Sequence, residues 1–374
     1  MPQNYDVIVI GTGGVGCAAL YQLASRGVNV LGIDRFPPGH DRGSSHGHTR
    51  IIRQAYFEHD NYVPLVLRAY PQWHELSDLV GEQLIRQNGI IEIGAADGTI
   101  IPPILASAKQ HNLKVDHVDR KDFLNRYSDF VLPDGCEIVF EGSAGILFVE
   151  RCVRAMAAIA TSRGAEIVSD ESVRDWKPDN NGVLVTTEKK QYQAKTLILS
   201  AGAWLQSSLS DLQLPLTVVR KHLHWYASDA YHIDDGTPTF FYETAEGYFY
   251  GFPALDSRGI KVGEHSGGVH VQDPLEDDRS VDPLDRQRVE AFLTEHIPRC
   301  SLTATDHAVC YYTRTPDEHF IVDRHPMHSQ VLICGGLSGH GFKFTPSLGE
   351  ALADLATTDH TDLPIEFLRL SRFE

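Results

Sequence analysis

A glycine-rich turn near the start of the chain constrains the fold more than any other feature. Gly11, Gly13 and Gly16 form a Gly-x-Gly-x-x-Gly motif between an apolar, strand-like run at residues 6–10 and a helical pattern at residues 15–25. The first glycine of such a turn permits the tight bend, the second lets a pyrophosphate approach the backbone, and the third lets helix and strand pack closely. The free N–H groups at the helix N-terminus favour a phosphate anion. The motif therefore predicts a βαβ unit that binds a dinucleotide.

Two further features indicate which dinucleotide this is. Asp34 ends the next predicted strand, residues 28–34, where an acidic side chain accepts hydrogen bonds from the adenosine ribose. Near the other end of the chain, a strand-like run, a glycine cluster and a helical pattern follow one another at residues 330–357. This second cluster favours FAD, because in such folds the late strand and helix return to the flavin end of the cofactor. An NAD-dependent dehydrogenase is the alternative.

Composition disfavours several other classes of protein. The 374 residues carry 33 Lys and Arg against 50 Asp and Glu, a net charge of −17, which disfavours nucleic acid and anionic membranes as partners. None of the six cysteines stands in a Cys-x-x-Cys pair, and no third ligand accompanies His46 and His48, so no metal site is predicted. No apolar run reaches the ~18 residues of a membrane span. We therefore expect a cytoplasmic protein that acts on a small molecule.

The order of helical and strand-like patterns predicts an α/β (α+β) fold with two domains. Helical patterns at residues 62–79, where Pro71 should kink the helix, and at residues 149–163 belong with the first βαβ unit. Two β-rich insertions interrupt this pattern, and Pro102 and Pro103 are interpreted as breakers in the first insertion. The predicted Rossmann-like FAD-binding domain is discontinuous and comprises residues 1–84, 146–214 and 328–374. The predicted β-sheet-rich substrate domain comprises residues 85–145 and 215–327.

Four stretches of the sequence together resemble one protein family. They are Gly43-Ser-Ser-His-Gly-His-Thr-Arg-Ile-Ile-Arg53, Tyr250-Gly-Phe-Pro with Lys261-x-Gly-x-His265, Cys310-Tyr-Tyr-Thr-x-Thr-Pro-Asp-Glu-His319, and Ser338-Gly-His-Gly-Phe-Lys343. In this order and at these separations they resemble the monomeric sarcosine oxidases and N-methyltryptophan oxidases, which are amino-acid-oxidase-type flavoproteins. The resemblance spans nearly the whole chain. It implies a monomer that joins an FAD-binding domain to a β-sheet substrate domain and oxidises a secondary amino acid with O₂.

The resemblance also implies a covalent flavin. Cys310 matches the cysteine that carries the flavin as an 8α-S-cysteinyl thioether in this family. A thiolate can attack the 8α position because the oxidised ring is electron-poor, and nearby cations should lower the pKa of the thiol. Packing as a small buried hydrophobic residue is the alternative for Cys310, and it is the expectation for the other five cysteines.

Basic residues are implied in three roles. Arg53 and Lys343 match the family's clamp for the substrate carboxylate, to which a guanidinium offers two parallel hydrogen bonds and an ammonium a second positive charge. Lys261 matches the lysine that activates O₂, since a fixed cation stabilises the negative charge that electron transfer creates. Arg50 and His46 match residues beside the flavin that stabilise its anionic reduced form.

The remaining implied residues surround the substrate and the cofactor. His265, Tyr250 and Tyr312 match residues around the substrate amine, which must be neutral to give up a hydride equivalent. Phe241 stands where the family varies with the side chain of the substrate. The cofactor-binding residues implied by the motif and the resemblance are Gly11, Gly13, Val15, Gly16, Asp34, Arg35, Ser44, His46, Thr49, Arg50, Val173, Ala201, Gly202, Trp204, Cys310, Gly339, Gly341 and Lys343.

The predicted activity is FAD-dependent oxidation of an N-methyl amino acid, with sarcosine as the first choice of substrate. The products would be glycine, formaldehyde and hydrogen peroxide. N-methyl-L-tryptophan, or a cyclic imino acid such as pipecolate or proline, is the alternative substrate. A flavin-binding protein without turnover is the non-enzymatic alternative.

Overall fold

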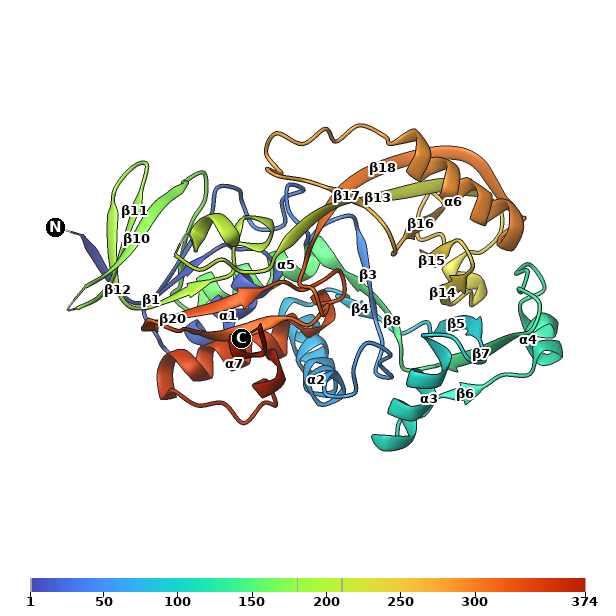
Figure 1. Cartoon of the computed structure of the whole chain (residues 1–374), viewed down its shortest axis with the longest axis horizontal. Helices are drawn as coiled ribbons and strands as arrows, with labels where there is room; N and C mark the ends of the chain where they lie inside the picture. The colour runs from blue at the N-terminus through green and yellow to red at the C-terminus, as the bar shows by residue number, and fades with distance from the viewer. Residues whose placement is uncertain (1, 180, 210, 374) are drawn as a thin grey trace.

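Two large β-sheets organise the molecule. The computed structural model describes residues 2–179, 181–209 and 211–373, so the outermost residues of the predicted FAD-binding domain, 1 and 374, lie outside it. Figure 1 shows one sheet at the left and the other at the right. A small antiparallel sheet lies between them and consists of β3 (Thr49–Ile52), β4 (Ile85–Arg86) and β8 (Gly145–Phe148).

The first sheet brings distant parts of the chain together. It has the order β10-β11-β12-β1-β2-β9, with β20 paired to β12 and β19 paired to β20. Its strands are β1 (Gln3–Ile10), β2 (Val30–Ile33), β9 (Glu166–Val168), β10 (Val173–Asp179), β11 (Gly182–Thr187), β12 (Gln191–Leu199), β19 (Ile321–His325) and β20 (His328–Gly335). β1 runs parallel to β2 and β12, and β12 runs parallel to β20. β9 also runs parallel to β2, so five carboxyl ends meet at one edge, where ligands of open α/β sheets bind.

Four helices accompany the first sheet. They are α1 (Gly14–Ser25), α2 (Tyr62–Val80), α5 (Val149–Ser162) and α7 (Thr345–Thr358). α1 contacts both α5 and α7 and is buried along almost its whole length. Gly349 permits the close approach of α7, since an added Cβ there would lie 2.6 Å from the Cβ of Ala18. α2 continues past Pro71 as a single helix. This packing fixes the N-terminal end of α1 at the edge of the sheet.

The second sheet has nine strands. Its order is β17-β13-β16-β15-β14-β5-β7-β6, with β18 paired to β13. Its strands are β5 (Ile90–Ala95), β6 (Asp116–His117), β7 (Cys136–Glu141), β13 (Thr217–Ser228), β14 (Thr239–Thr244), β15 (Gly247–Phe252), β16 (Ile260–Glu264), β17 (Val269–His270) and β18 (Cys300–Arg314). β13 and β18 form a long antiparallel pair, visible along the upper right of Figure 1. The predicted boundaries between the two domains stay a prediction.

Three helices interrupt the stretches that were predicted to be strand and turn. They are α3 (Ile101–Gln110), α4 (Arg120–Arg126) and α6 (Pro283–His296). The interpretation of Pro102 and Pro103 as breakers was wrong, because both lie in the first turn of α3, where the missing N–H groups cost no intrahelical bond. Asp119 and Asp282 each accept hydrogen bonds from two backbone N–H groups and so cap α4 and α6. These two aspartates are the sequence features that mark the starts of α4 and α6.

Short 3-10 helices complete the chain. They are η1 (Gly202–Trp204), η2 (Gln206–Ser208), η3 (Ile233–Asp235), η4 (Phe342–Phe344), η5 (Glu366–Leu368) and η6 (Leu370–Phe373). η1 follows β12 and η4 directly precedes α7, so both lie at the edge of the first sheet that faces the second. No helix in the described part of the chain is both long enough and apolar enough to cross a membrane.

Candidate active site

A deep cleft runs from the edge of the first sheet to the second sheet. It encloses about 2040 Å³ of empty space, open mouth included, which is room for a dinucleotide and a small substrate. Its lining includes Gly11 and Asp34 from the first βαβ unit, Cys310 from β18, and Lys343 from η4. The cleft thus joins both glycine clusters to the aromatic strands of the second sheet.

The glycine turn has the geometry that its sequence predicts. Gly11 has φ +92°, and a Cβ added there would lie 2.5 Å from the carbonyl oxygen of Ser200. A Cβ on Gly16 would lie 1.8 Å from the carbonyl oxygen of Gly11, so helix and strand can pack only around glycine. Gly13 lies just before α1 and offers no side-chain cap, and in the first turn the N–H of Gly14 donates to the hydroxyl of Ser45 at 3.2 Å. The turn thus has the geometry expected of a phosphate site at a helix N-terminus.

Most of the predicted cofactor residues line this cleft. They are Gly11, Gly13, Val15, Asp34, Arg35, Ser44, Arg50, Val173, Ala201, Gly202, Trp204, Cys310, Gly339, Gly341 and Lys343. The other three predicted cofactor residues do not line the cleft; they are Gly16, His46 and Thr49. Three groups of lining residues, Trp204 Nε1, Thr313 Oγ1 and Thr345 Oγ1, are buried without a hydrogen-bond partner in the protein. Such groups fit a polar ligand, and the acceptors of FAD would satisfy them.

The predicted amine-binding residues meet on one side of the cleft. Tyr250, His265 and Tyr312 all line it, and Nδ1 of His265 lies 3.3 Å from the hydroxyl of Tyr312. Burial, and then the cation of Lys221, lowers the pKa of His265 to about 3, so its ring is neutral near pH 7. Burial also raises the pKa of both tyrosines. These three side chains present polar groups that carry no charge near neutral pH.

Arg53 is held by acidic and aromatic neighbours. Its guanidinium donates to the backbone oxygen of Ala55 at 2.6 Å and to Glu58 at 2.7 Å. The rings of Tyr56 and Phe57 lie 4.3 and 4.2 Å from its central carbon. Burial opposes the charge on both partners of the ion pair, but the Arg53 cation holds the pKa of Glu58 at about 2 and Glu58 raises the pKa of Arg53. Arg53 is therefore a fixed cation in the cleft wall.

A second carboxyl group stands behind Arg53. Glu92 on β5 is 1% exposed, and its Oε1 lies 3.5 Å from Nε of Arg53. Neither of its oxygens has a hydrogen-bond partner, and burial raises its pKa to about 8. A neutral Glu92 near pH 7 leaves the charge of Arg53 to be balanced by Glu58 alone.

Lys343 lies beside this group. Its ammonium donates to the backbone oxygen of His340 at 2.7 Å and to the hydroxyl of Tyr56 at 3.2 Å. Burial, and then the Arg53 cation, lowers the pKa of Lys343 to about 7. Tyr56 links the two basic residues, since its ring packs on Arg53 and its hydroxyl accepts from Lys343. The two cations predicted to bind a carboxylate thus lie in one network.

Lys261 lies just outside the cleft wall. It is 2% exposed, and its ammonium donates to the backbone oxygens of Gly47 and Thr49 at 2.7 and 2.9 Å and to the hydroxyl of Thr49 at 3.1 Å. Phe252 and Trp225 cover it with their rings. In this arrangement the ammonium of Lys261 is bound by backbone oxygens and does not line the cleft.

Arg50 places a positive charge in the part of the cleft wall that lies next to Lys261. Its guanidinium lines the cleft and donates to the backbone oxygens of Thr49 and Ser44, both at 2.7 Å. Burial, and then the cation of Arg50, lowers the pKa of His46 to about 3, so His46 is neutral near pH 7. Of this predicted pair, only Arg50 carries a charge.

Sequence reasoning missed the partners of the cations. Glu58 and Tyr56 lie close to Arg53 in the chain, but their spacing carries no recognisable motif. Glu92 reaches the site from β5 and no local pattern marks it, whereas His340 lies in the quoted stretch from Ser338 to Lys343 but was given no role. Thr345, which lines the cleft at the start of α7, was not predicted as a site residue.

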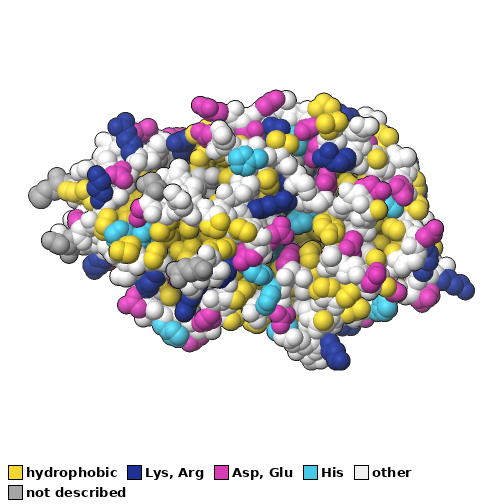
Figure 2. All heavy atoms as spheres, viewed as in Figure 1, with side chains coloured by type: hydrophobic (Ala, Val, Ile, Leu, Met, Phe, Trp, Pro, Cys, Tyr) yellow, Lys and Arg dark blue, Asp and Glu magenta, His cyan; other side chains and the backbone are white. Residues whose placement is uncertain are grey.

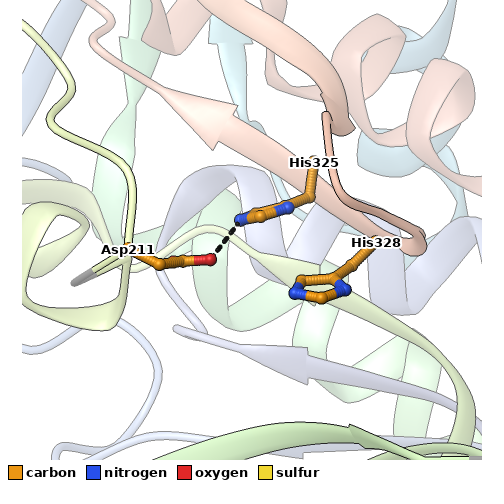
Figure 3. Close-up of side chains that lie close together, drawn as sticks. All are labelled: Asp211, His325 and His328. Atoms are coloured by element: carbon orange, nitrogen blue, oxygen red, sulfur yellow. Dashed lines mark ion pairs between the residues drawn. The ribbon is translucent and has the colours of Figure 1, made fainter.

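Three possible metal ligands lie close together away from the cleft. Figure 3 shows Asp211, His325 and His328, whose donor atoms lie within 4.8 Å of one another. The backbone N–H of Met327 donates to Nδ1 of His325, so the proton of the neutral ring is on Nε2. That nitrogen lies 3.0 Å from the carboxylate of Asp211. In this tautomer Nε2 carries the proton and offers no lone pair to a metal ion.

The surface carries charge of both signs. On the face drawn in Figure 2, acidic and basic side chains are interspersed, and the described basic residues do not gather into one patch there. Nothing on this face resembles the continuous basic surface that binds nucleic acid.

Comparison with known proteins identifies the class. The chain matches the FAD dependent oxidoreductase family (DAO) over residues 6–355, and it belongs to that family. It is 38% identical to the monomeric sarcosine oxidase of Bacillus sp. (strain B-0618), over 100% of this chain and 97% of that protein. It is also 38% identical to the N-methyl-L-tryptophan oxidase of Escherichia coli (strain K12 / DH10B), over 100% of both chains. The predicted resemblance and the predicted cofactor, FAD, are confirmed.

Solved structures share the fold. The open form of NikD, an amino acid oxidase essential for nikkomycin biosynthesis, superposes with a TM-score of 0.86 at 24% identity, covering 98% of this chain and 97% of that one. L-proline dehydrogenase from P. horikoshii gives a TM-score of 0.85 at 21% identity, covering 100% of this chain and 98% of that one. The predicted α/β (α+β) fold with a Rossmann-like FAD-binding part is confirmed. The chain is a flavin-dependent oxidoreductase, which sets aside the NAD-dependent and non-catalytic alternatives.

Proposed function

We propose that this protein oxidises N-methyl amino acids with FAD and O₂, and that sarcosine is its preferred substrate. Glycine, formaldehyde and hydrogen peroxide would be the products. The observation that carries the proposal is the pair of buried basic residues, Arg53 and Lys343, in the wall of the cleft that the glycine turn opens. Two such residues in one network are suited to an anionic group of the substrate. Relatives named for sarcosine and N-methyl-L-tryptophan oxidation support the substrate class.

The walls beside Arg53 favour a small substrate. Phe57 and Phe241 line the cleft there, with ring centroids 5.5 Å apart, and Phe241 also packs edge-on to His265. These rings occupy the space next to the carboxylate site, where the side chain of a larger amino acid would lie. The glycine skeleton of sarcosine has no side chain, whereas N-methyl-L-tryptophan would require Phe57 or Phe241 to move.

The chemistry divides between cofactor and protein. Bound FAD would supply the acceptor for two electrons and pass them on to O₂. Arg53 and Lys343 would hold the carboxylate, while the uncharged His265, Tyr250 and Tyr312 would disfavour the ammonium form of the substrate amine. Arg50 and Lys261 would place positive charge where electron transfer builds negative charge. We further propose that Cys310 holds the flavin covalently and that the protein works as a monomer on a small substrate.

Peroxide release tests the proposed function. The purified holoprotein would be assayed with sarcosine, N-methyl-L-tryptophan, L-pipecolate and L-proline, with glycine as the primary-amine control. We expect peroxide from sarcosine with the highest kcat/KM and none from glycine. A flavin-loaded protein that releases no peroxide with any secondary amino acid would contradict the proposal, and a preference for N-methyl-L-tryptophan would contradict the choice of sarcosine.

The low pKa of Lys343 predicts a pH dependence of substrate binding. Only the ammonium form attracts a carboxylate, and the pKa of Lys343 in the free site is about 7. Affinity should therefore be greatest below pH 7 and fall as pH rises, approaching about tenfold per pH unit because one proton is linked to binding. Ionisation of Glu92, whose pKa is about 8, acts in the same direction. His340 and Glu58, with pKa values of about 4 and 2, titrate below this range.

Acetate, the carboxylate fragment of sarcosine, is a suitable probe for this prediction. Its Kd would be measured from the visible absorbance of the bound flavin between pH 6 and 9. The variant Lys343→Met should bind acetate weakly and lose the part of the pH dependence centred near 7. An acetate Kd that stays constant over this range in the native protein would refute the prediction.

A further inference from the structure

The loop that binds the ammonium of Lys261 is bound in turn, on its opposite side, by the start of α5. Lys261 donates to the backbone oxygens of Gly47, in the loop that leads into β3, and of Thr49, the first residue of β3. Gly47 and His48 have φ values of +88° and +73°, so two consecutive residues adopt the left-handed conformation. For His48 this conformation is costly and needs support from its surroundings.

Glu150 supplies that support. Its carboxylate accepts hydrogen bonds from the backbone N–H of Gly47 at 2.7 Å and from the N–H of His48 at 3.0 and 3.1 Å. The N–H of Val149, at the start of α5, donates to the carbonyl of His48 at 3.1 Å. The first turn of α5 thus binds the N–H groups of the loop, and the carbonyls of the same loop bind Lys261.

The two sides of the loop are separate environments. Glu150 and His48 line a second cavity that also includes Arg258 and Trp225, and Glu150 does not line the main cleft. Glu150 therefore does not touch the flavin site and can act on it only through the loop and through its charge.

The charges around Lys261 give Glu150 a second effect. Burial, and then Arg50 of β3, lowers the pKa of Lys261 well below its ordinary value, and Arg258, from the loop before β16, acts in the same direction. Cys310 of β18 and Glu150 of α5 oppose this. Trp225 of β13 and Phe252 of β15 cover Lys261 with aromatic rings, which carry no charge. Among these neighbours Glu150 is the carboxylate that favours the ammonium form.

We infer that Glu150 is a positioning residue for the reaction with O₂: it fixes the loop of residues 46–49 so that two carbonyls aim at Lys261, and its negative charge favours the ammonium form of Lys261. The inference rests on the proposed role of Lys261 and deepens it. No contact between Glu150 and the substrate is involved. Flavin reduction by sarcosine should therefore be insensitive to Glu150, whereas reoxidation of the reduced flavin by O₂ should depend on it.

The test compares four variants of the holoenzyme with the native protein. Glu150→Gln keeps an oxygen acceptor but removes the charge, and Glu150→Asp keeps the charge on a shorter side chain. Lys261→Met removes the ammonium. Asp122→Asn is the matched control, because Asp122 is an exposed acid in the first turn of α4. Each variant is followed by stopped-flow reduction with sarcosine, by stopped-flow reoxidation with O₂, and by titration of the visible spectrum of the oxidised flavin against pH.

For Glu150→Gln we expect reoxidation slower by about tenfold near pH 7, with reduction unchanged within about twofold. The spectral transition that Lys261→Met abolishes should move to lower pH in Glu150→Gln, since loss of the anion destabilises the ammonium. Glu150→Asp should keep that transition near its native position, and Asp122→Asn should match the native protein throughout.

Three results would overturn the inference, and they are distinguishable. If Lys261→Met reoxidises slowly but Glu150→Gln does so at the native rate with an unmoved transition, Glu150 has no such role. If Glu150→Gln loses both half-reactions equally along with thermal stability, its role is structural. If Lys261→Met reoxidises at the native rate, the proposed role of Lys261 fails as well, while peroxide production from sarcosine would still support the proposed function.

Discussion

Replacing Cys310 with serine is expected to abolish covalent attachment of the flavin completely. Cys310 is 1% exposed, lines the cleft and lies on β18 directly across from Lys221 of β13. Serine is nearly isosteric but is a far weaker nucleophile than a thiolate, so FAD should still enter the cleft and remain dissociable. Trichloroacetic-acid precipitation separates the two outcomes, because covalent flavin stays yellow in the pellet and free flavin stays in the supernatant.

The proposed attachment would have a definite balance of atoms and electrons. A carbon–sulfur bond would form at the 8α carbon of the flavin, while the S–H bond of Cys310 and one C–H bond of the ring methyl group would break. Two electrons and two protons would be released overall and would pass to O₂, giving hydrogen peroxide. Attachment should therefore require O₂, and it should stop under anaerobic conditions even with the native protein.

Cys334 provides the matched control. It also lines the cleft and is 2% exposed, but burial raises the pKa of its thiol to about 12. A thiol that does not ionise is a poor nucleophile. Cys334→Ala should therefore keep all of its flavin in the pellet. A yellow pellet from Cys310→Ser, or a colourless pellet from the native protein, would contradict the assignment.

Loss of the Lys343 ammonium, or of the paired donors of Arg53, should raise KM for sarcosine by about 100-fold. A hydrogen bond to a charged group contributes roughly 1.5–3 kcal/mol, and 2.7 kcal/mol corresponds to about a factor of 100. Lys343→Met preserves the length of the side chain and removes the charge. Arg53→Lys keeps one positive charge beside Glu58 and Glu92 but loses the planar pair of donors, which avoids leaving two acids buried without a cation.

Steady-state kinetics at pH 6.5 and saturating O₂ would measure these effects. Lys109→Met is the control, because Lys109 is an exposed lysine at the end of α3, and it should change neither kcat nor KM. If both clamp variants retain the native KM for sarcosine, the carboxylate binds elsewhere. A fall in kcat without a change in KM would mean that the cations serve the oxidation step instead of binding.

Turns and helix starts that depend on a few neighbouring residues could be predicted from the sequence. The turn at Gly11 and Gly16 leaves no space for a Cβ, and its pattern could be read directly from spacing. The helix at residues 283–296 was missed because its polar surface gives weak periodicity, although Asp282 and Pro283 form a recognisable helix start. Strand β12 (Gln191–Leu199) is one continuous strand, because it pairs with β1 over nearly its whole length and with β11 at its start.

The site depends on contacts that no local pattern encodes. Glu92 reaches Arg53 from β5, in a stretch predicted only as strand and turn, so its raised pKa follows from tertiary burial alone. Lys261 was expected beside the cleft on the basis of family resemblance, but three acceptors on the loop at Gly47 and Thr49 draw its ammonium behind the wall. Side-chain identity could thus be predicted, whereas the partners that set charge and orientation could not.

Anaerobic titration of the holoenzyme tests the central claim most directly. The claim is that the cleft binds FAD and oxidises a small N-methyl amino acid that is held by its carboxylate. With sarcosine in the absence of O₂, we predict that one equivalent bleaches the visible flavin absorbance and that admitting O₂ restores the colour with one equivalent of peroxide. Sarcosinamide, which keeps the methylamine but has no carboxylate, should reduce the flavin far more slowly. Equal rates of bleaching with sarcosine and sarcosinamide, or no bleaching with either, would contradict the account.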